Sequence, residues 1–427
     1  MQDSIEISPS GPIDAQVRPP GSKSITNRAL VCAALAAGTS TLQGALDSDD
    51  TRVMFDALGQ LGIAAQFDSE RATLSVAGCA GRIPAERADL FVGNSGTTVR
   101  FLAAMLTIAQ GEFHLSGTRR MHERPIGDLL EALRQWGTEA VSDQANGCPP
   151  LTIRSHGLRG GEATVRGDTS SQFLSGLLMA APYAEQQAVL TVAGPLVSQP
   201  YVEMTLAVME AFGVRVAREA AGRFRVPNDR PYAARTYDIE PDASAASYFF
   251  AAAAIAGGTI TVRGLARDSL QGDVRFVDVL ARMGCQVDYA ADAITVRGGP
   301  LRGVSVDMND ISDTVQTLGA VALFAEGTTE IRGVGHIRHK ETDRLAALSA
   351  ELRKLGALVE QRGDGLAITP GPLRAARIAT YDDHRMAMSL ALVGLKVPGV
   401  TILDPGCTAK TYPRYWEDLA AVSCPNA

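Results

Sequence analysis

Gly21-Ser22-Lys23-Ser24 places polar and charged side chains directly before an apolar, Ala-rich segment that we expect to be helical. The arrangement occurs six times in the chain. The other five starts are Gly93-Asn94-Ser95-Gly96-Thr97-Thr98, Asp168-Thr169-Ser170-Ser171-Gln172, Asp242-Ala243-Ser244, Asp310-Ile311-Ser312-Asp313-Thr314 and Asp382-Asp383-His384-Arg385. A helix start presents unpaired N–H groups and a partial positive charge, so several converging starts would suit a multiply charged anion.

A second, amphipathic helix is predicted to end at a glycine in five of these copies. The glycines are Gly62, Gly137, Gly213, Gly284 and Gly356, which lie about 75, 76, 71 and 72 residues apart. Each apolar helix leads into a strand, and two short β-like segments precede each polar start. The sequence therefore predicts six related α/β repeats.

The sixth copy stops early, because only a short tail follows its second helix near 412–421. Two β-like segments stand at the other end of the chain, at 4–8 and 13–17. We therefore expect the N-terminal strands to complete the last repeat. Three repeats per domain then give a discontinuous domain of residues 1–20 and 241–427 and a second domain of residues 21–240. A ring of six repeats is the competing layout.

Composition is typical of a folded enzyme and excludes several other classes. The 427 residues suffice for two or three domains, and with 46% hydrophobic and 20% charged residues disorder is not expected. A net charge of −7 argues against nucleic acid as the main partner. No apolar segment is long enough to span a bilayer, and the N-terminus lacks a signal peptide, so we expect a cytoplasmic protein with no membrane association.

Cysteine spacing and glycine spacing exclude several kinds of cofactor site. The six cysteines contain no C-x-x-C pair, which predicts free thiols rather than a disulfide frame or a zinc site; they are Cys32, Cys79, Cys148, Cys285, Cys407 and Cys424. A P-loop would need glycine at Val17 and at Ser22. The segment 93–98 is too short for a dinucleotide fingerprint. Neither ATP nor a nicotinamide cofactor is supported.

Basic side chains gather at the polar starts and nearby turns of this acidic chain. They are Lys23, Arg28, Arg100, Arg124, Lys340, Arg344, Arg385 and Lys410. Lys340 and Arg344 are predicted in the first turn of a helix that runs to Gly356, where like charges four apart repel and cations are disfavoured. A shared anion would remove both penalties; the alternative is that Glu341 and Asp343 neutralise them at the surface.

Arg124 precedes a proline that suits the first position of the helix ending at Gly137. Pro125 would hold Arg124 extended at the mouth of that helix. An ordinary surface arginine is the competing interpretation.

Asp313 and Glu341 are the best candidates for acid–base chemistry, since each carboxylate sits at a polar start where its proton affinity can be tuned. The alternatives are a helix cap for Asp313 and a salt bridge to Arg344 for Glu341. Asp382-Asp383-His384 is better explained by helix capping than by metal binding, because successive side chains diverge.

Eight motifs, in this order and spacing, resemble the 5-enolpyruvylshikimate-3-phosphate (EPSP) synthase family over essentially the whole chain. They are Pro20-Gly-Ser-Lys-Ser-Ile-Thr-Asn-Arg28, Gly93-Asn-Ser-Gly-Thr97, Arg120-Met-His-Glu-Arg-Pro-Ile126, Ser170-Ser-Gln172, Asp242-Ala-Ser-Ala-Ala-Ser-Tyr248, Lys340-Glu-Thr-Asp-Arg344, Asp382-Asp-His-Arg-Met386 and Cys407-Thr-Ala-Lys410. Most are weak alone; together they are specific.

The resemblance implies transfer of the enolpyruvyl group of phosphoenolpyruvate to the 5-hydroxyl of shikimate 3-phosphate, with release of phosphate, in aromatic amino acid biosynthesis. It implies the enolpyruvyl transferase fold: a two-domain, inverted α/β barrel-like architecture of six βαβαββ repeats, with the active site in the interdomain cleft and hinges near Pro20 and Glu240. It implies a monomer with no cofactor and no metal, since fixed cations can hold the phosphate and carboxylate.

The same resemblance supplies the site residues. Shikimate 3-phosphate would contact Lys23, Ser24, Arg28, Ser170, Ser171, Gln172, Ser198, Tyr201, Asp313, His336 and Lys340. Phosphoenolpyruvate would contact Lys23, Gly96, Arg124, Gln172, Arg344, Arg385 and Lys410. In an addition–elimination reaction, Asp313 would be the base and Glu341 or Lys23 the acid, with roles reversed for elimination.

Three residues depart from the family pattern: His336 stands where asparagine is frequent, Phe101 where proline is common, and Ser95 where alanine is common. Glyphosate often blocks this family at the phosphoenolpyruvate site. Gly96 favours sensitivity here, and Phe101 leaves its degree open.

Three other functions compete with this assignment. The related UDP-N-acetylglucosamine enolpyruvyl transferase would carry a reactive cysteine in the loop 119–124, where this chain has none. An enzyme acting on RNA ends would need a basic surface. A non-catalytic anion-binding protein would explain the cations but gives Asp313 and Glu341 no task.

Overall fold

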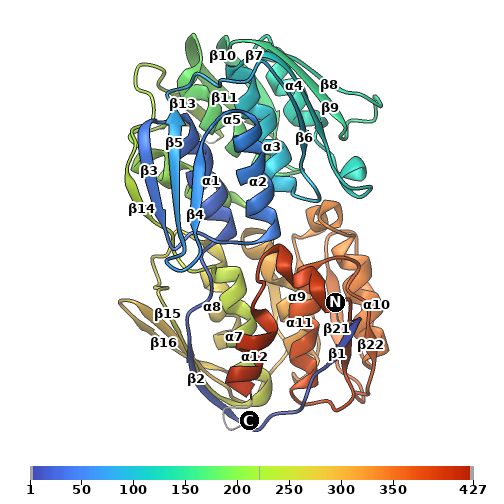
Figure 1. The fold of residues 1–427 in the computed structure, drawn as a ribbon. Helices are drawn as coiled ribbons and strands as arrows, with labels where there is room; N and C mark the ends of the chain where they lie inside the picture. The colour runs from blue at the N-terminus through green and yellow to red at the C-terminus, as the bar shows by residue number, and fades with distance from the viewer. Residues whose placement is uncertain (1–2, 221, 424–427) are drawn as a thin grey trace. The chain divides into compact units, whose positions relative to one another are not determined.

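The computed structural model describes residues 3–220 and 222–423; Cys424 and the rest of the C-terminal tail lie outside them (Figure 1). Contacts divide the chain into two compact units. We call Met1–Pro20 with Glu240–Ala427 the split unit, and Gly21–Ile239 the continuous unit. The five cysteines within the described ranges are free thiols.

The repeated element order is strand, helix, strand, helix and two further strands, which confirms the six-repeat α/β fold predicted from the sequence. The second repeat shows it completely: β6 (Arg87–Phe91), α3 (Gly96–Met105), β7 (Gln110–Ser116), α4 (Gly127–Gln135), β8 (Glu139–Ser142) and β9 (Leu151–His156). Its sheet has the order β6-β7-β9-β8, with β6 parallel to β7 and the other pairs antiparallel.

The first and third repeats of the continuous unit follow the same plan. The first contains α1 (Lys23–Leu35), β3 (Ala37–Gln43), α2 (Asp49–Gln60), β4 (Ala65–Asp68) and β5 (Thr73–Cys79). The third contains β10 (Gly160–Arg166), α5 (Ser171–Ala180), β11 (Gln186–Ala193), α6 (Gln199–Ala211), β12 (Ala217–Ala220) and β13 (Arg223–Val226), and β14 (Thr236–Asp238) follows it.

The split unit holds the remaining repeats. The fourth contains α7 (Ala243–Ala256), β15 (Gly258–Arg263), α8 (Phe276–Met283), β16 (Gln286–Ala290) and β17 (Ala293–Arg297). The fifth contains β18 (Ser305–Asp307), α9 (Val315–Ala322), β19 (Thr329–Arg332), α10 (Arg344–Lys354), β20 (Leu358–Gln361) and β21 (Leu366–Thr369). The sixth contains β22 (Arg377–Ile378), α11 (His384–Gly394), β23 (Thr401–Leu403) and α12 (Tyr415–Ser423).

The N-terminal strands correct one prediction. β1 (Ser4–Glu6) pairs antiparallel with β23 and so joins the sixth sheet, as expected. β2 (Ile13–Val17) instead pairs parallel with β15 in the fourth sheet. The position that β2 would fill by repeat order, beside β3, is taken by β14. The strands that precede α1 and α7 are thus exchanged between the two units.

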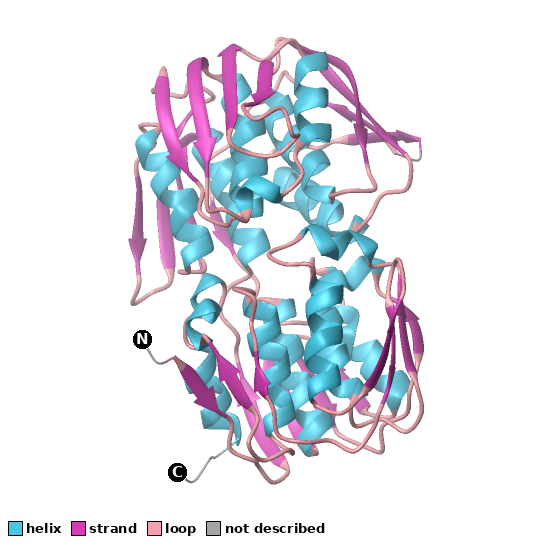
Figure 2. Cartoon of the chain, turned by 90° about the vertical axis from the view of Figure 1, so that its right-hand side faces the viewer, coloured by secondary structure: helices cyan, strands magenta, loops and turns pink. Residues whose placement is uncertain are grey.

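Each unit has its own hydrophobic core around its apolar helices, with the sheets on the outside (Figure 2). All residues of α7 are buried, and the core of the continuous unit includes most of α1, α3 and α5. Short side chains let such helices approach closely, which explains their alanine content. No helix within residues 3–220 and 222–423 is long and apolar enough to cross a membrane.

Glycines end the second helices as predicted. The φ angles are 80° at Gly62, 84° at Gly137, 98° at Gly213, 118° at Gly284 and 111° at Gly356. Side chains with a Cβ atom disfavour this left-handed region, so glycine at these positions lets the chain turn from helix to strand.

Candidate active site

In the split unit, two of the three polar starts are capped helix termini. Asp242 accepts a hydrogen bond from the Ala245 amide, and Asp383 accepts one from the Arg385 amide. Capping by Asp383 agrees with the prediction. The third start differs, because a 3-10 helix at Asn309–Thr314 precedes α9 and carries Asp313.

Arg344 is the centre of the charge cluster in this unit. Its Nε lies 2.8 Å from Asp383 Oδ2, one terminal nitrogen lies 2.8 Å from Glu341 Oε2, and the other lies 3.1 Å from Asp313 Oδ1. The residue is 1% exposed. Burial lowers its pKa, but the three carboxylates outweigh burial and raise it above its usual value.

Asp313 and Glu341 each join Arg344 to further cations. Asp313 Oδ2 lies 2.7 Å from Arg385, and Asp313 Oδ1 lies 3.8 Å from Lys340 Nζ. Glu341 Oε1 lies 3.4 Å from Lys410 Nζ. All six predicted charged residues of this unit therefore form one connected cluster, which also includes Asp383.

The prediction that Lys340 lies inside the helix ending at Gly356 is wrong. The α10 helix begins at Arg344, and Asp343 caps it by accepting from the Ala346 amide. Lys340 instead follows a 3-10 helix at Gly335–His339. Lys340 and Arg344 are therefore not an i,i+4 helical pair, although both approach Asp313 Oδ1. Arg344 does occupy the cation-disfavouring first turn. Glu341 neutralises Arg344 in a buried ion pair rather than at the surface.

His336 belongs to the same region through a hydrogen bond with Ser312, whose Oγ lies 3.1 Å from Nε2. Burial, together with Lys340, lowers its pKa from 6.5 to about 4. His336 is therefore neutral at pH 7 in the absence of an added anion.

In the continuous unit, the first polar start places Lys23 and Ser24 in the first turn of α1, which Ser22 caps. Arg28 lies one turn further and is 1% exposed. Its guanidinium donates to the Ser24 and Tyr201 carbonyls at 2.9 and 3.1 Å and to Thr205 Oγ1 at 2.7 Å, all neutral acceptors. Burial lowers its pKa to about 10, so it remains charged at pH 7.

Gly96 and Arg124 are in direct contact. A Cβ atom on Gly96 would lie 2.3 Å from a terminal nitrogen of Arg124, which donates from its other terminal nitrogen to the Asn94 carbonyl at 2.9 Å. Arg124 is extended, as predicted. Pro125 is not the first helical residue, because α4 begins at Gly127 after Ile126.

Gln172 bridges the second and third repeats. Its Oε1 accepts from Arg100 at 2.6 Å, and its Nε2 donates to Thr97 Oγ1 at 3.0 Å. Ser170 caps α5 by accepting from the Gln172 amide, and Ser171 is the first residue of that helix. The predicted serine and glutamine side chains thus lie at one helix start.

Ser198 and Tyr201 stand at the start of α6. Ser198 is buried and has φ 52° and ψ 47°, a left-handed conformation that is unfavourable for serine. The Tyr201 ring lies 5.9 Å from the Arg28 guanidinium, and Phe101 lies 5.2 Å from it on α3. These contacts connect α6 to the first two polar starts.

Three residues take part in these networks without having been predicted as site residues. Asp383 contacts Arg344, Arg100 holds Gln172, and the Tyr248 hydroxyl lies 3.4 Å from Arg385. The sequence indicates that Asp383 caps a helix and that Arg100 lies on a buried helix. Their partners, Arg344 and Gln172, are distant along the chain.

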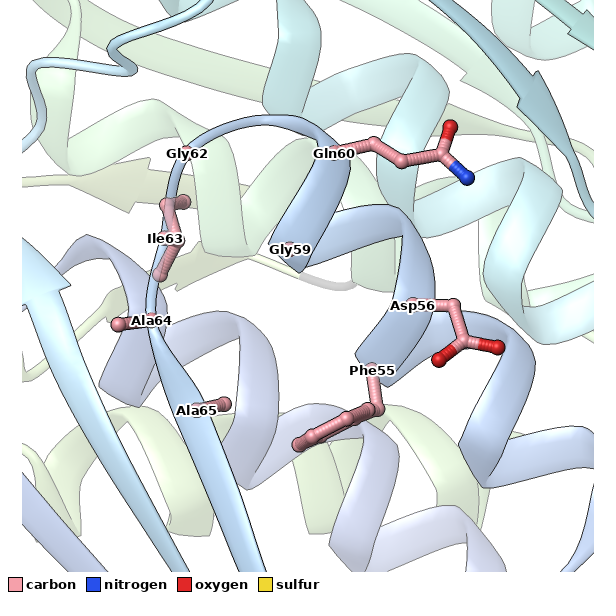
Figure 3. Close-up of a pocket in the computed structure, with 8 residues that line it drawn as sticks. All are labelled: Phe55, Asp56, Gly59, Gln60, Gly62, Ile63, Ala64 and Ala65. Atoms are coloured by element: carbon pink, nitrogen blue, oxygen red, sulfur yellow. The ribbon is translucent and has the colours of Figure 1, made fainter.

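Three surface pockets are lined by residues outside these polar clusters. One of about 680 Å³ lies between α2 and the chain leading into β4, lined by residues such as Phe55, Gln60 and Ile63 (Figure 3). None of its lining residues was predicted to bind substrate. We therefore assign the site from the polar clusters and not from this pocket.

Comparison with known proteins gives one consistent family. The family model for EPSP synthase (3-phosphoshikimate 1-carboxyvinyltransferase) matches residues 7–419 of this chain. The 3-phosphoshikimate 1-carboxyvinyltransferase of Nostoc punctiforme is 49% identical to this chain, over 97% of this chain and 98% of that protein. The protein of the same name from Erwinia tasmaniensis is 49% identical over 99% of both chains.

Solved structures agree on the fold. EPSP synthase from Acinetobacter baumannii matches with a TM-score of 0.82 and 24% identity over 99% of this chain and 98% of that one. An enolpyruvyl transferase from Streptomyces tendae matches with a TM-score of 0.79 and 21% identity over 98% of this chain and 97% of that one. The chain therefore belongs to the EPSP synthase family, and its activity is that of a 3-phosphoshikimate 1-carboxyvinyltransferase of the shikimate pathway.

Proposed function

We propose that the polar clusters of the two units hold the two substrates and carry out the enolpyruvyl transfer. Shikimate 3-phosphate contacts Lys23, Ser24, Arg28, Ser170, Ser171, Gln172, Ser198, Tyr201, Asp313, His336 and Lys340. Phosphoenolpyruvate contacts Lys23, Gly96, Arg124, Gln172, Arg344, Arg385 and Lys410. The observation that carries the proposal is the buried network in which Arg344 meets both Asp313 and Glu341.

The concentration of cations supports anion binding at this network. Lys340, Arg344, Arg385 and Lys410 each lie 2.7–3.8 Å from an oxygen of Asp313, Glu341 or Asp383. A substrate phosphate or carboxylate would compete for Arg344, Arg385 and Lys410. Exchange of partners would release the oxygens of Asp313 and Glu341 for proton transfer.

The proposed reaction has two steps. In the addition, Asp313 takes the proton of the 5-hydroxyl, the oxygen bonds to the central carbon of phosphoenolpyruvate, and Glu341 or Lys23 protonates the methylene carbon. In the elimination, the bond between that carbon and the phosphate oxygen breaks, phosphate leaves with the proton held by Asp313, and a methyl proton returns to Glu341 or Lys23. The cations stabilise the charge of the departing phosphate.

Substitution of the two carboxylates tests these roles. We expect Asp313→Asn and Glu341→Gln each to lower kcat by about 100-fold or more while both substrates still bind. Asp310→Asn is the matched control, because Asp310 lies on the same 3-10 helix but pairs with Arg275 at 3.2 Å. Full turnover in both variants would refute the acid–base assignment.

We also propose that glyphosate inhibits the enzyme at the phosphoenolpyruvate contacts, with Gly96 leaving Arg124 in place. Phosphate release that is unaffected by a large excess of glyphosate over phosphoenolpyruvate would contradict this. We further propose a cytoplasmic monomer. Free thiols in the described residues and two cores completed within one chain support these two assignments, and light scattering tests the second.

A further inference from the structure

We propose that Glu351 is a positioning residue that, through Tyr381, holds the turn from which Asp383 and Arg385 project. The idea rests on the proposed function, which assigns Arg385 to phosphoenolpyruvate. Neither Glu351 nor Tyr381 is among the residues expected to touch a substrate.

Glu351 is a fully buried carboxylate with a full set of donors. Both of its oxygens lie 2.8 Å from Lys354 Nζ. Oε1 also accepts from the Tyr381 hydroxyl at 2.7 Å, and Oε2 accepts from the Ala379 amide at 3.1 Å. A buried charge is costly unless it is paired and hydrogen-bonded, so a role in holding these donors would explain its presence.

The turn that Glu351 contacts has an unfavourable backbone. Tyr381 and Asp382 have φ angles of 56° and 53°, and the Asp383 amide donates to the Thr380 carbonyl at 2.9 Å. Two successive residues with positive φ are the pattern of a type I′ turn, which favours glycine and asparagine. Tyrosine is poorly suited to it, and strained residues persist only where their surroundings hold them.

This turn leads directly into the charge cluster. Asp383 caps α11 and contacts Arg344, while Arg385 contacts Asp313. Arg344 and Glu351 are seven residues apart on α10 and so lie on one face of it. The α10 helix therefore contacts the segment 379–385 at two places. Arg344 contacts Asp383 in the charge cluster, and Glu351 contacts Ala379 and Tyr381.

Steady-state kinetics on the full chain tests the proposal with Tyr381→Phe, Glu351→Gln and the double variant. We expect Tyr381→Phe to raise the KM for phosphoenolpyruvate about threefold or more, and Glu351→Gln at least as much. The KM for shikimate 3-phosphate should stay within about twofold of the parent value. The double variant should be no worse than Glu351→Gln, because both changes remove the same contact.

Tyr289→Phe is the matched control, since the Tyr289 hydroxyl donates to Asp278 at the same 2.7 Å in the fourth repeat, away from the charge cluster. It should leave both KM values unchanged. Arg385→Lys is the reference for the assignment of Arg385 itself. Should Glu351→Gln not fold, Tyr381→Phe alone decides.

Two results would overturn the inference. One is an unchanged KM for phosphoenolpyruvate in Tyr381→Phe while Arg385→Lys raises it. The other is an equal rise in both KM values, which indicates a general structural role. If Arg385→Lys leaves the KM for phosphoenolpyruvate unchanged, the assignment of Arg385 fails first, and the inference falls with it.

Discussion

Arg124 occupies the space that a side chain at position 96 would need, and glycine leaves this space open. A Cβ atom there would meet the guanidinium carbon at 2.7 Å, well inside van der Waals contact. Since Arg124 is 3% exposed, little room is left for a harmless displacement. Gly96 therefore allows the Arg124 guanidinium to lie at the start of α3.

Gly96→Ala should therefore raise the KM for phosphoenolpyruvate by about tenfold and change the KM for shikimate 3-phosphate little. Initial rates at varied concentrations of each substrate measure this. Gly363→Ala is the control, because a Cβ atom there meets nothing within 4 Å and the backbone is not left-handed. Unchanged kinetics in Gly96→Ala would show that the position of Arg124 does not matter.

His336 makes stability depend on pH in a defined direction. Its folded-state pKa of about 4 lies below the ordinary 6.5, so the unfolded chain binds more protons between these values. Stability is therefore full above about pH 6.5 and falls as the pH drops toward 4. The loss from this residue by pH 5 is up to about 2 kcal/mol.

Asparagine at this position removes the titration and keeps a hydrogen-bonding side chain. Without substrates, His336→Asn should lose less stability than the parent between pH 7 and pH 5 in urea unfolding. An identical loss in both proteins would mean that His336 is not held neutral by its surroundings.

At the scale of the elements, much of the site could be predicted because its chemistry is local. Ser22, Ser95, Ser170, Asp242 and Asp383 all cap the helices that they precede, as their residue types indicate. One helix start was predicted wrongly although its signal is also local. The α10 helix begins at Arg344 rather than Lys340 because Asp343 caps it by accepting from the Ala346 amide.

Glycine has opposite effects at the end of a helix and inside one. At Gly356, φ is 111° and a Cβ atom would lie 2.2 Å from the Pro372 carbonyl oxygen. Gly356→Ala should therefore lower the free energy of unfolding by more than about 1 kcal/mol. Gly59 lies inside α2 with nothing within 4 Å of a Cβ atom, so Gly59→Ala should raise it by about 0.5–1 kcal/mol. Denaturant titration of both variants measures this, and equal shifts would refute the distinction.

At the scale of the whole molecule, the pairing of strands that are distant along the chain could not be predicted from the sequence. The repeat count predicted that the N-terminus completes the sixth repeat, which holds for β1. The exchange of β2 and β14 depends on which sheet edge each strand meets, and short β-like segments do not specify their partners.

Removal of residues 1–7 tests this topology. The truncation deletes the partner of β23 and the Ile7 amide that donates to the Val400 carbonyl at 3.0 Å. Amide hydrogen exchange should then accelerate in β22 and β23, whereas β10, β11 and β13 of the continuous unit keep their protection. Equal loss of protection in both units would contradict the assignment of β1 to the sixth sheet alone.

The most direct test of the central claim is phosphate release from phosphoenolpyruvate with two acceptors in parallel, shikimate 3-phosphate and UDP-N-acetylglucosamine, with no metal added. Membership of the EPSP synthase family predicts release with shikimate 3-phosphate alone. Release with the sugar nucleotide alone would contradict the acceptor assignment, and release with neither would contradict the transferase activity.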